Sequence, residues 1–470
     1  MSGEATAVRV IAVSRVVPSP APAEHVRVVL SFLDAPWIAT PPVQNVYLYK
    51  LSGVGDPNDE YAATVKWIKA SLAAALALFV PLAGELKYVP ETGDVVVDCS
   101  DPAVPFFEAE AESSRRMDID RLAGDAAHDV EAFVSLVPRH DARVLPARVL
   151  SLQATRLRGA GLALGLSVHH AVADGRAMAL FLYAWSSASR GGGGSPVTSS
   201  KLLGPPPDYT REAVARTHPS GHELARALVK KVAPNLPANY IQANSKADYF
   251  SQRSQLARRT FFVSADEVRF LKHRIERLAS AAGEPKPTVS TFAALVTLGW
   301  TGMVRAKGLS EGEDAYLTFY ADLRARLRPT VGASYFGNCI TGCLAKANAG
   351  DLLGEAGLLH ASRAVVAALR EMEEAPMAMA ETWVESVARL PLARVVTRVA
   401  GDTVFRVDEV GDFGFGKPCR VESVSMVHDG RIIIKGRSRP DGEVMVSVVL
   451  HPAHMEAFMA HINGGLRSRI

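Results

Sequence analysis

The length, composition and charge of the chain indicate a folded protein with two domains. Its 470 residues exceed what one hydrophobic core usually serves, and 48% hydrophobic with 21% charged residues is a globular composition. A formal net charge of +3, without a run of basic residues, argues against nucleic acid as a partner. The cysteines show no CxxC pair and no metal-ligand spacing, so we expect reduced thiols and no metal site. They are Cys99, Cys339, Cys343 and Cys419.

The apolar stretches favour neither a signal peptide nor a membrane span. Arg9 and Arg15 interrupt the apolar segment near the N-terminus. The longest uncharged apolar stretch, residues 70–84, is shorter than a membrane span and contains Pro81. We therefore expect a cytoplasmic protein without a membrane partner. Nothing indicates an obligate protein partner, so a monomer is expected.

The predicted elements of the first half are strands and helices in alternation. Residues 26–33 (VRVVLSFL) are apolar enough for a buried strand, and residues 60–79 are typical of a helix. A short strand is expected at GDVVVDC. Residues 148–157 and 162–170 predict a hairpin joined by RGAG. A helix, RAMALFLYAW, follows the hairpin.

A glycine-rich stretch then predicts the domain boundary. Residues 191–194 are four glycines, and three prolines follow at 205–207. We expect an N-terminal domain over 1–190, a flexible crossover linker over 191–225 and a C-terminal domain over 226–470.

The second half again alternates strands and helices. TFFV predicts a strand, and the next helix begins at Ser264, with Glu267 completing a capping box. Another helix is expected from Ser290, and AYLTFYADLRARL predicts a strand followed by three arginines. RIIIKG and EVMVSVVL predict two late strands. Interleaved strands and helices in both halves indicate the α/β class.

One histidine is placed as a general base would be. His169 and His170 end an apolar strand in the sequence HHAVADG, which has Asp174 four residues after His170. A sheet fixes a base at its strand end, and imidazole exchanges protons near neutral pH. The spacing alone is weak, since about half a match to HxxxD is expected by chance among thirteen histidines. Asp174 fits equally well as the N-cap of the following helix.

A second motif near the C-terminus gives the first one its meaning. DFGFGKP, at residues 412–418, alternates glycines with aromatics and by itself predicts only a tight turn. Together with HxxxDG, and with LSFLDAPW, PLAGEL, DLRARLRP and YFGNC in the same order, it resembles the plant BAHD acyltransferase family. The resemblance extends over nearly the whole chain. It departs from the family pattern at Phe415, where tryptophan is usual.

The resemblance implies a fold and a mechanism. The family fold is two chloramphenicol-acetyltransferase-like domains with a solvent channel between them. His170 then deprotonates the acceptor, whose oxygen attacks the thioester of an acyl-CoA co-substrate, and no permanently bound cofactor is expected. Asp174 orients the site by pairing with Arg324, Arg326 or Arg328. Asp412 is expected to hold its loop through a salt bridge, in a structural motif completed by Gly414, Phe415 and Gly416.

YFGNC resembles the branch of the family that acylates anthocyanin, flavonoid and other phenolic glucosides, commonly with malonyl-CoA. The expected acceptor is thus a sugar hydroxyl, while the motif itself fits a turn around Gly337 with packing aromatics. Arg176 is a candidate for the malonyl carboxylate, although a solvated arginine is the ordinary interpretation. Candidates for coenzyme A are Ser290 and Thr291 at a helix N-terminus, and Arg258, Arg259, Lys417 and Arg420. Trp37 is the candidate for the acceptor side.

Three alternatives stay open. In the first alternative, the donor is a hydroxycinnamoyl, benzoyl or acetyl thioester and the acceptor is another alcohol or an amine. In the second alternative, the protein is a serine hydrolase, but the sequence lacks the GxSxG motif that such an enzyme usually carries. In the third alternative, the chain is a non-catalytic ligand-binding relative. The intact His170, Asp174 and Gly175 argue against this.

Overall fold

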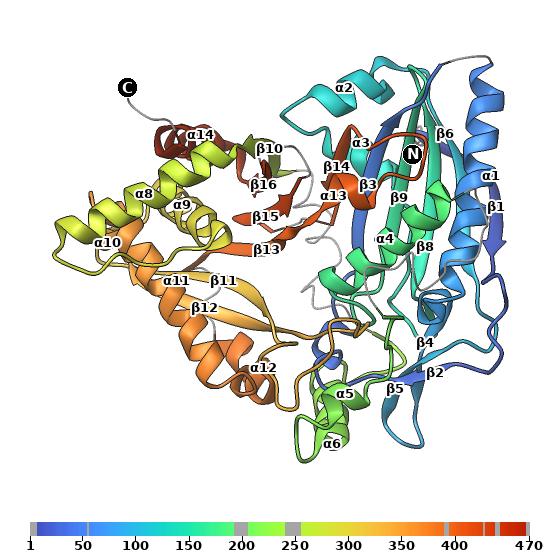
Figure 1. Cartoon of the computed structure of the whole chain (residues 1–470), viewed down its shortest axis with the longest axis horizontal. Helices are drawn as coiled ribbons and strands as arrows, with labels where there is room; N and C mark the ends of the chain where they lie inside the picture. The colour runs from blue at the N-terminus through green and yellow to red at the C-terminus, as the bar shows by residue number, and fades with distance from the viewer. Residues whose placement is uncertain are drawn as a thin grey trace, which may run out of the picture. The chain divides into compact units, whose positions relative to one another are not determined.

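The computed structural model describes residues 7–53, 56–191, 205–239, 255–389, 394–425, 428–437 and 442–466. They form two compact units (Figure 1). Unit 1 is built from 1–244, 327–339 and 407–425, and unit 2 from 245–326, 340–406 and 426–470. Both units combine a six-stranded mixed sheet with helices, which confirms the α/β class. The expected channel between the domains stays a prediction.

The main sheet of unit 1 carries the predicted hairpin at its centre. Its strand order is β1 (Val8–Val16), β6 (Val104–Ala111), β8 (Leu150–Leu157), β9 (Gly161–Val168), β3 (Val43–Lys50) and β14 (Arg420–Ser423). Strands β8 and β9 pair antiparallel with Leu157 opposite Gly161, as the hairpin pattern predicts. Only β6 and β8 pair in parallel among the neighbours described in this sheet.

A smaller sheet and several helices complete unit 1. The small sheet runs β2 (Arg27–Val29), β5 (Asp94–Asp98), β4 (Glu85–Val89) and β7 (Ala147–Arg148). The longest helices are α1 (Pro57–Leu76) and α4 (Gly175–Arg190), and α6 (Gly221–Val232) follows them. The short helices are η1 (Ala35–Trp37), η2 (Val80–Ala83), η3 (Arg115–Met117), α2 (Ile119–Gly124), α3 (Val130–Ser135), α5 (Glu212–Ala215) and α13 (Val407–Val410).

Strand β9 is buried along its whole length because helices cover both faces of the sheet. On one face, Leu48 of β3 packs in a core cluster with Ile119 and Phe133 of the α2–α3 region. The next side chain of β3, Tyr49, points to the opposite face, where α4 lies. A Cβ on Gly165 would lie 2.1 Å from the carbonyl oxygen of Leu136, the C-cap residue of α3. This close packing fixes the strand that ends at the two histidines.

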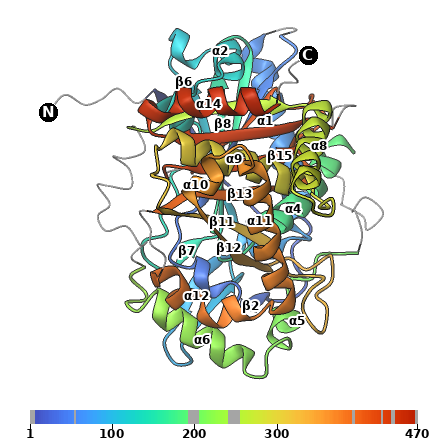
Figure 2. The ribbon, with the colours of Figure 1, turned by 90° about the vertical axis from the view of Figure 1, so that its left-hand side faces the viewer.

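Unit 2 is a sheet with helices packed on it. The strand order is β10 (Ala257–Val263), β16 (Val444–Leu450), β15 (Arg431–Gly436), β13 (Val395–Arg406), β11 (Asp314–Asp322) and β12 (Ile340–Asn348). Helices α9 and α11 pack on β13 and β12 (Figure 2). The predicted capping box of Ser264 and Glu267 is confirmed at the start of α8. The helices are α8 (Ala265–Ala281), α9 (Thr291–Ala306), α10 (Ala349–Leu353), α11 (Gly357–Glu374), α12 (Ala378–Arg389) and α14 (Pro452–Leu466).

The structure corrects two expectations about chain organisation. The predicted linker, 191–225, is largely outside the described residues up to 204, but its second part carries α5 and the start of α6 within unit 1. The DFGFG segment also belongs to unit 1, not to the C-terminal domain, because β14 pairs with β3. The strand predicted over 26–33 covers only β2, since Ser31 and Asp34 turn the chain into η1.

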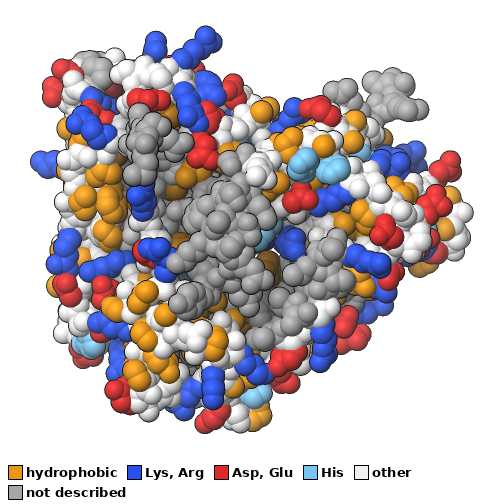
Figure 3. All heavy atoms as spheres, turned by 180° about the vertical axis from the view of Figure 1, so that it is seen from behind, with side chains coloured by type: hydrophobic (Ala, Val, Ile, Leu, Met, Phe, Trp, Pro, Cys, Tyr) orange, Lys and Arg blue, Asp and Glu red, His pale blue; other side chains and the backbone are white. Residues whose placement is uncertain are grey.

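Charges of both signs are interspersed on the face drawn in Figure 3, as expected for a small net charge. Exposed apolar side chains are Val10, Ile11, Val13, Val17, Trp67, Val144 and Phe262. Across the described part of the chain, no helix combines the length and apolarity needed to cross a bilayer.

Candidate active site

The two adjacent histidines have different environments. His169 is fully buried, and its Nδ1 accepts the N–H of Ala171 at 3.2 Å. Burial, with smaller contributions from His140 and His170, lowers the pKa of His169 to about 3, so its ring is neutral at pH 7. His170 is half-buried, in the turn between β9 and α4. The more accessible ring is therefore the one that the sequence predicts as the base.

Trp37 forms one wall of the environment of His170. The two rings stack with centroids 4.1 Å apart and planes inclined by 8°. Trp37 is buried at the end of η1, where Thr40 donates its hydroxyl to the Trp37 carbonyl at 2.7 Å. The sequence predicts Trp37 on the acceptor side, and the structure places it directly against the predicted base.

Asp174 is the N-cap of α4 and also anchors the YFGNC segment. One carboxylate oxygen accepts the N–H of Ala177 at 2.9 Å, and the other accepts the N–H of Cys339 at 3.0 Å. The capping interpretation is thus confirmed, and Asp174 is buried with 1% exposure. Asp174 therefore joins the start of α4 to the YFGNC segment, and its orienting role in the site stays a prediction.

The predicted arginine partner of Asp174 stays a prediction. Arg326 forms an ion pair with Glu373 at 3.0 Å, and Arg324 contacts Asp322 at 3.3 Å. Arg328 donates to the carbonyl of Leu327.

The structure contains a buried ion pair next to the turn of His170 that the sequence did not predict. Asp34, fully buried, accepts from Nε of Arg211 at 2.8 Å. Its other oxygen accepts both the backbone N–H of Asn338 and its side-chain Nδ2. Arg211 also donates to the carbonyl of Val172 at 2.9 Å, inside the HHAVADG turn. The available signal was one charged residue within the apolar LSFLDAPW.

The DFGFG loop is held at the far end of α4. Phe413 is fully buried, with its ring 4.5 Å from that of Trp185. Ser189 donates to the Phe413 carbonyl at 2.6 Å, and Arg190 donates to the carbonyl of Asp412 at 2.5 Å. Ser189 lies fifteen residues after Asp174 along α4, a rise of roughly 22 Å. The loop is therefore remote from His170, as the resemblance implies.

Asp412 forms no ion pair with any described residue, contrary to the expected salt bridge. Its carboxylate accepts the N–H of Gly414 at 3.1 Å, and Arg190 reaches its backbone carbonyl instead. Gly414 and Gly416 have φ of +94° and +113°, which suits glycine. Phe415 packs edge-on against Tyr49 at 5.0 Å, so a ring without an indole N–H fits here.

The predicted donor-binding residues are divided between the two units. Arg176 is half-buried in the first turn of α4. In unit 2, Ser290 caps α9 by accepting the N–H of Ala293 at 3.1 Å, and Thr291 is the first helical residue. Arg258 is buried in β10, whereas its neighbour Arg259 pairs with Glu456 at 2.6 Å on the other face. Lys417 is exposed in unit 1.

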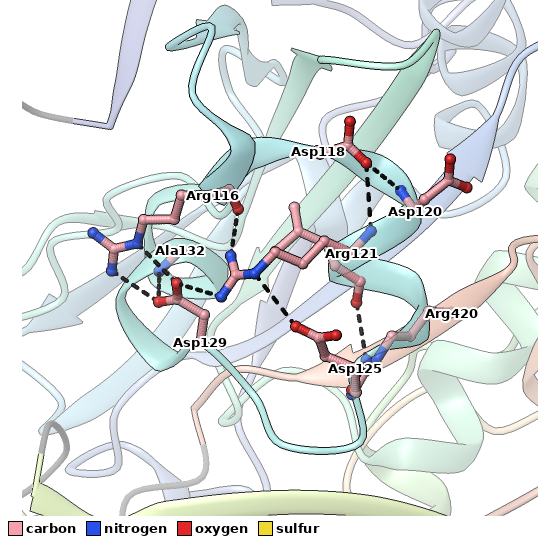
Figure 4. Close-up of polar contacts among 9 residues, drawn as sticks. Arg116, Asp118, Asp120, Arg121, Asp125, Asp129, Ala132 and Arg420 are labelled. Atoms are coloured by element: carbon pink, nitrogen blue, oxygen red, sulfur yellow. Dashed lines mark hydrogen bonds and ion pairs between the residues drawn. The ribbon is translucent and has the colours of Figure 1, made fainter.

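Arg420 is not a phosphate ligand. It is buried, pairs with Glu422 at 2.8 Å and donates to the carbonyls of Leu122 and Asp125 (Figure 4). Nε and Nη1 of its guanidinium make these bonds, which hold the α2–α3 region on β14. The same figure shows Arg116 and Arg121 on Asp129, with contacts of 2.8 and 3.2 Å. Among the described residues, no group of His, Cys, Asp and Glu is arranged to hold a metal ion.

A model of the Transferase family matches residues 6–464. The chain belongs to this family of BAHD acyltransferases. It is 26% identical to phenolic glucoside malonyltransferase 2 of Arabidopsis thaliana over 93% of this chain and 94% of the relative. It is 25% identical to an Arabidopsis coumaroyl-CoA:anthocyanidin 3-O-glucoside-6''-O-coumaroyltransferase over 93% of each. The crystal structure of vinorine synthase matches with a TM-score of 0.71 at 18% identity, over 98% of this chain and 99% of that one.

The match to vinorine synthase confirms the predicted fold, and the named relatives confirm that this member of the BAHD family is an acyltransferase.

Proposed function

We propose that the protein transfers a malonyl group from malonyl-CoA to a sugar hydroxyl of a phenolic or flavonoid glycoside, with His170 as the general base. The observation that carries the proposal is the half-buried imidazole of His170 at the end of a rigid strand, beside Trp37. The substrate class is supported by the malonyltransferase relative, whose acceptors are phenolic glucosides by name.

The chemistry needs one base and two substrates held together. The His170 imidazole accepts the proton of the acceptor hydroxyl while the oxygen bonds to the thioester carbonyl carbon. The tetrahedral intermediate collapses by breaking the carbon–sulfur bond. The thiolate of coenzyme A leaves and takes the proton back from the imidazolium, so the base is regenerated. No acyl-enzyme is required, because proximity of the two substrates supplies much of the acceleration.

A second donor class has its own support. The coumaroyltransferase relative is as similar in extent and identity as the malonyltransferase relative, so a coumaroyl donor is the second candidate. Arg176, in the first turn of α4, is our proposed partner of a malonyl carboxylate. Ser290, Thr291, Arg258, Arg259 and Lys417 remain proposals for coenzyme A. A cytoplasmic location and a monomeric state stay predictions.

The test is a donor panel. The protein is incubated with malonyl-, coumaroyl- and acetyl-CoA and a mixture of phenolic glucosides, and the products are followed by mass. We expect one malonyl group per product and a loss of about 10²–10⁴ in kcat for His170→Ala. His222→Ala, an exposed histidine of the same unit, is the control and should retain full activity. Unchanged turnover of His170→Ala would refute the assigned base.

A further inference from the structure

One buried carboxylate holds both the turn of His170 and the turn of Trp37. Asp34 is the N-cap residue of η1, and its carboxylate accepts the backbone N–H and the hydroxyl of Ser31 at 2.9 and 2.7 Å. These bonds shape the turn whose last residue is Trp37. The other oxygen of Asp34 receives the Nδ2 of Asn338 at 2.9 Å.

Asn338 continues the connection to the base. Its second Nδ2 hydrogen goes to the main-chain carbonyl of His170, also at 2.9 Å. The amide therefore bridges Asp34 and His170 directly, using both of its hydrogens. Arg211 adds a parallel support, because it joins Asp34 to the carbonyl of Val172, two residues after the base.

We propose that Asp34, Arg211 and Asn338 are positioning residues that set the His170 ring against Trp37, a role that rests on the proposed function of His170. The two rings come from segments more than 130 residues apart in sequence, and their stacked geometry is fixed through Asp34. Displacing a reacting group by about 1 Å can lower a rate about 10²-fold. Replacing buried ion pairs by apolar groups is often neutral or stabilising, so stability alone is a weak reason for this one.

The YFGNC segment thereby gains a function beyond packing. Its Asn338 and Cys339 donate to the His170 carbonyl and to Asp174 respectively, at both ends of the HxxxD motif. A Cβ on Gly337 would lie 2.6 Å from Nη1 of Arg211, so the segment approaches the arginine as closely as a glycine permits.

The first experiment compares Asn338→Ala with Gln153→Ala. Gln153 is a matched control in unit 1: its buried amide also donates two bonds, to the carbonyl of Ser135 and the hydroxyl of Thr155, both at 2.9 Å. We expect similar losses of Tm for the two variants. For Asn338→Ala alone, kcat should fall about 10–100-fold while KM for malonyl-CoA changes less than about twofold. Equal kcat values for the two variants would overturn the proposal.

The second experiment does not need turnover. Histidine labelled with ¹³C at Cε1 gives one NMR resonance per ring, and His170→Ala identifies that of His170. The ring current of Trp37 should displace this resonance, and Trp37→Leu should remove the displacement. Asn338→Ala should move it and Gln153→Ala should not. If the His170 resonance does not move in Asn338→Ala, the positioning role is refuted. If the resonance moves but the wild-type protein transfers no acyl group, only the proposed function is refuted.

Discussion

Removal of Arg211 tests the buried ion pair most directly. The Arg211 side chain is 4% exposed and that of its partner Asp34 is fully buried, so Arg211→Ala leaves an uncompensated carboxylate in the interior. It also removes the donors to the carbonyls of Tyr209, Phe336 and Val172. Breaking a buried pair from one side costs roughly 3–5 kcal/mol, which corresponds to a Tm lower by about 6–20 °C for the transition of unit 1.

The reason lies in the charges. Burial by itself lowers the pKa of Arg211, but the nearby Asp34 and Tyr335 outweigh it, so the pKa is raised and the cation persists. The folded state thus contains two charges that depend on each other. Removing both should therefore destabilise the protein less than the sum of the two single removals.

The assay is a double-mutant cycle of Arg211→Ala and Asp34→Ala, followed by thermal and urea denaturation with a probe in unit 1. We expect a coupling of about 2–3 kcal/mol. Arg15→Ala removes an exposed arginine from Asp101 and should leave the Tm unchanged, which makes it the control. Strictly additive losses at Arg211 and Asp34 would refute the reasoning.

Three further predictions concern packing and pH. Phe413→Ala should destabilise unit 1 by about 3–5 kcal/mol, and activity should fall only in proportion to the folded fraction. Circular dichroism and kinetics on one sample would measure both. A lower kcat in fully folded enzyme would contradict this. Gly337→Ala should lower stability by about 1–3 kcal/mol, because its Cβ meets Arg211 and the Tyr335 hydroxyl at 2.6 Å; an unchanged urea midpoint would contradict the close approach. His169 has a folded pKa of about 3 against an ordinary 6.5, so the unfolded chain binds the extra proton and stability is lost as pH falls from about 6.5 toward 3. His169→Asn should reduce that loss by about 2 kcal/mol between pH 6.5 and 5 in urea denaturation, and parallel pH profiles of the two proteins would exclude the effect.

Local sequence signals predicted the elements around the site well. The hairpin of β8 and β9 and the capping box of α8 depend on residues within a few positions of one another, so the pattern contains the cause. The strand end that carries His169 and His170 was also predictable, because an apolar run that ends at two polar residues is a local signal. The different burial of the two rings needed the structure, since it depends on tertiary packing.

What the sequence could not predict arises from segments far apart in the chain. Asp34, Arg211 and Asn338 come from three such segments, and only the fold shows that one carboxylate joins them. The domain boundary was wrong for the same reason: residues 327–339 and 407–425 return to unit 1 through contacts that no local composition announces. Arg420 was misread because a cation on a strand end is compatible with a phosphate or with a buried carboxylate, and Glu422 decides between them.

The position of α4 between the two motifs has a consequence for its length. Its N-cap Asp174 closes the turn of the base, and Ser189 and Arg190 at its other end grip the DFGFG loop. One inserted residue would rotate one end against the other by about 100° and shift it by about 1.5 Å. Such a change would break the contacts at one end, so the length of α4 between Asp174 and Ser189 is as strictly constrained as the residues that make these contacts.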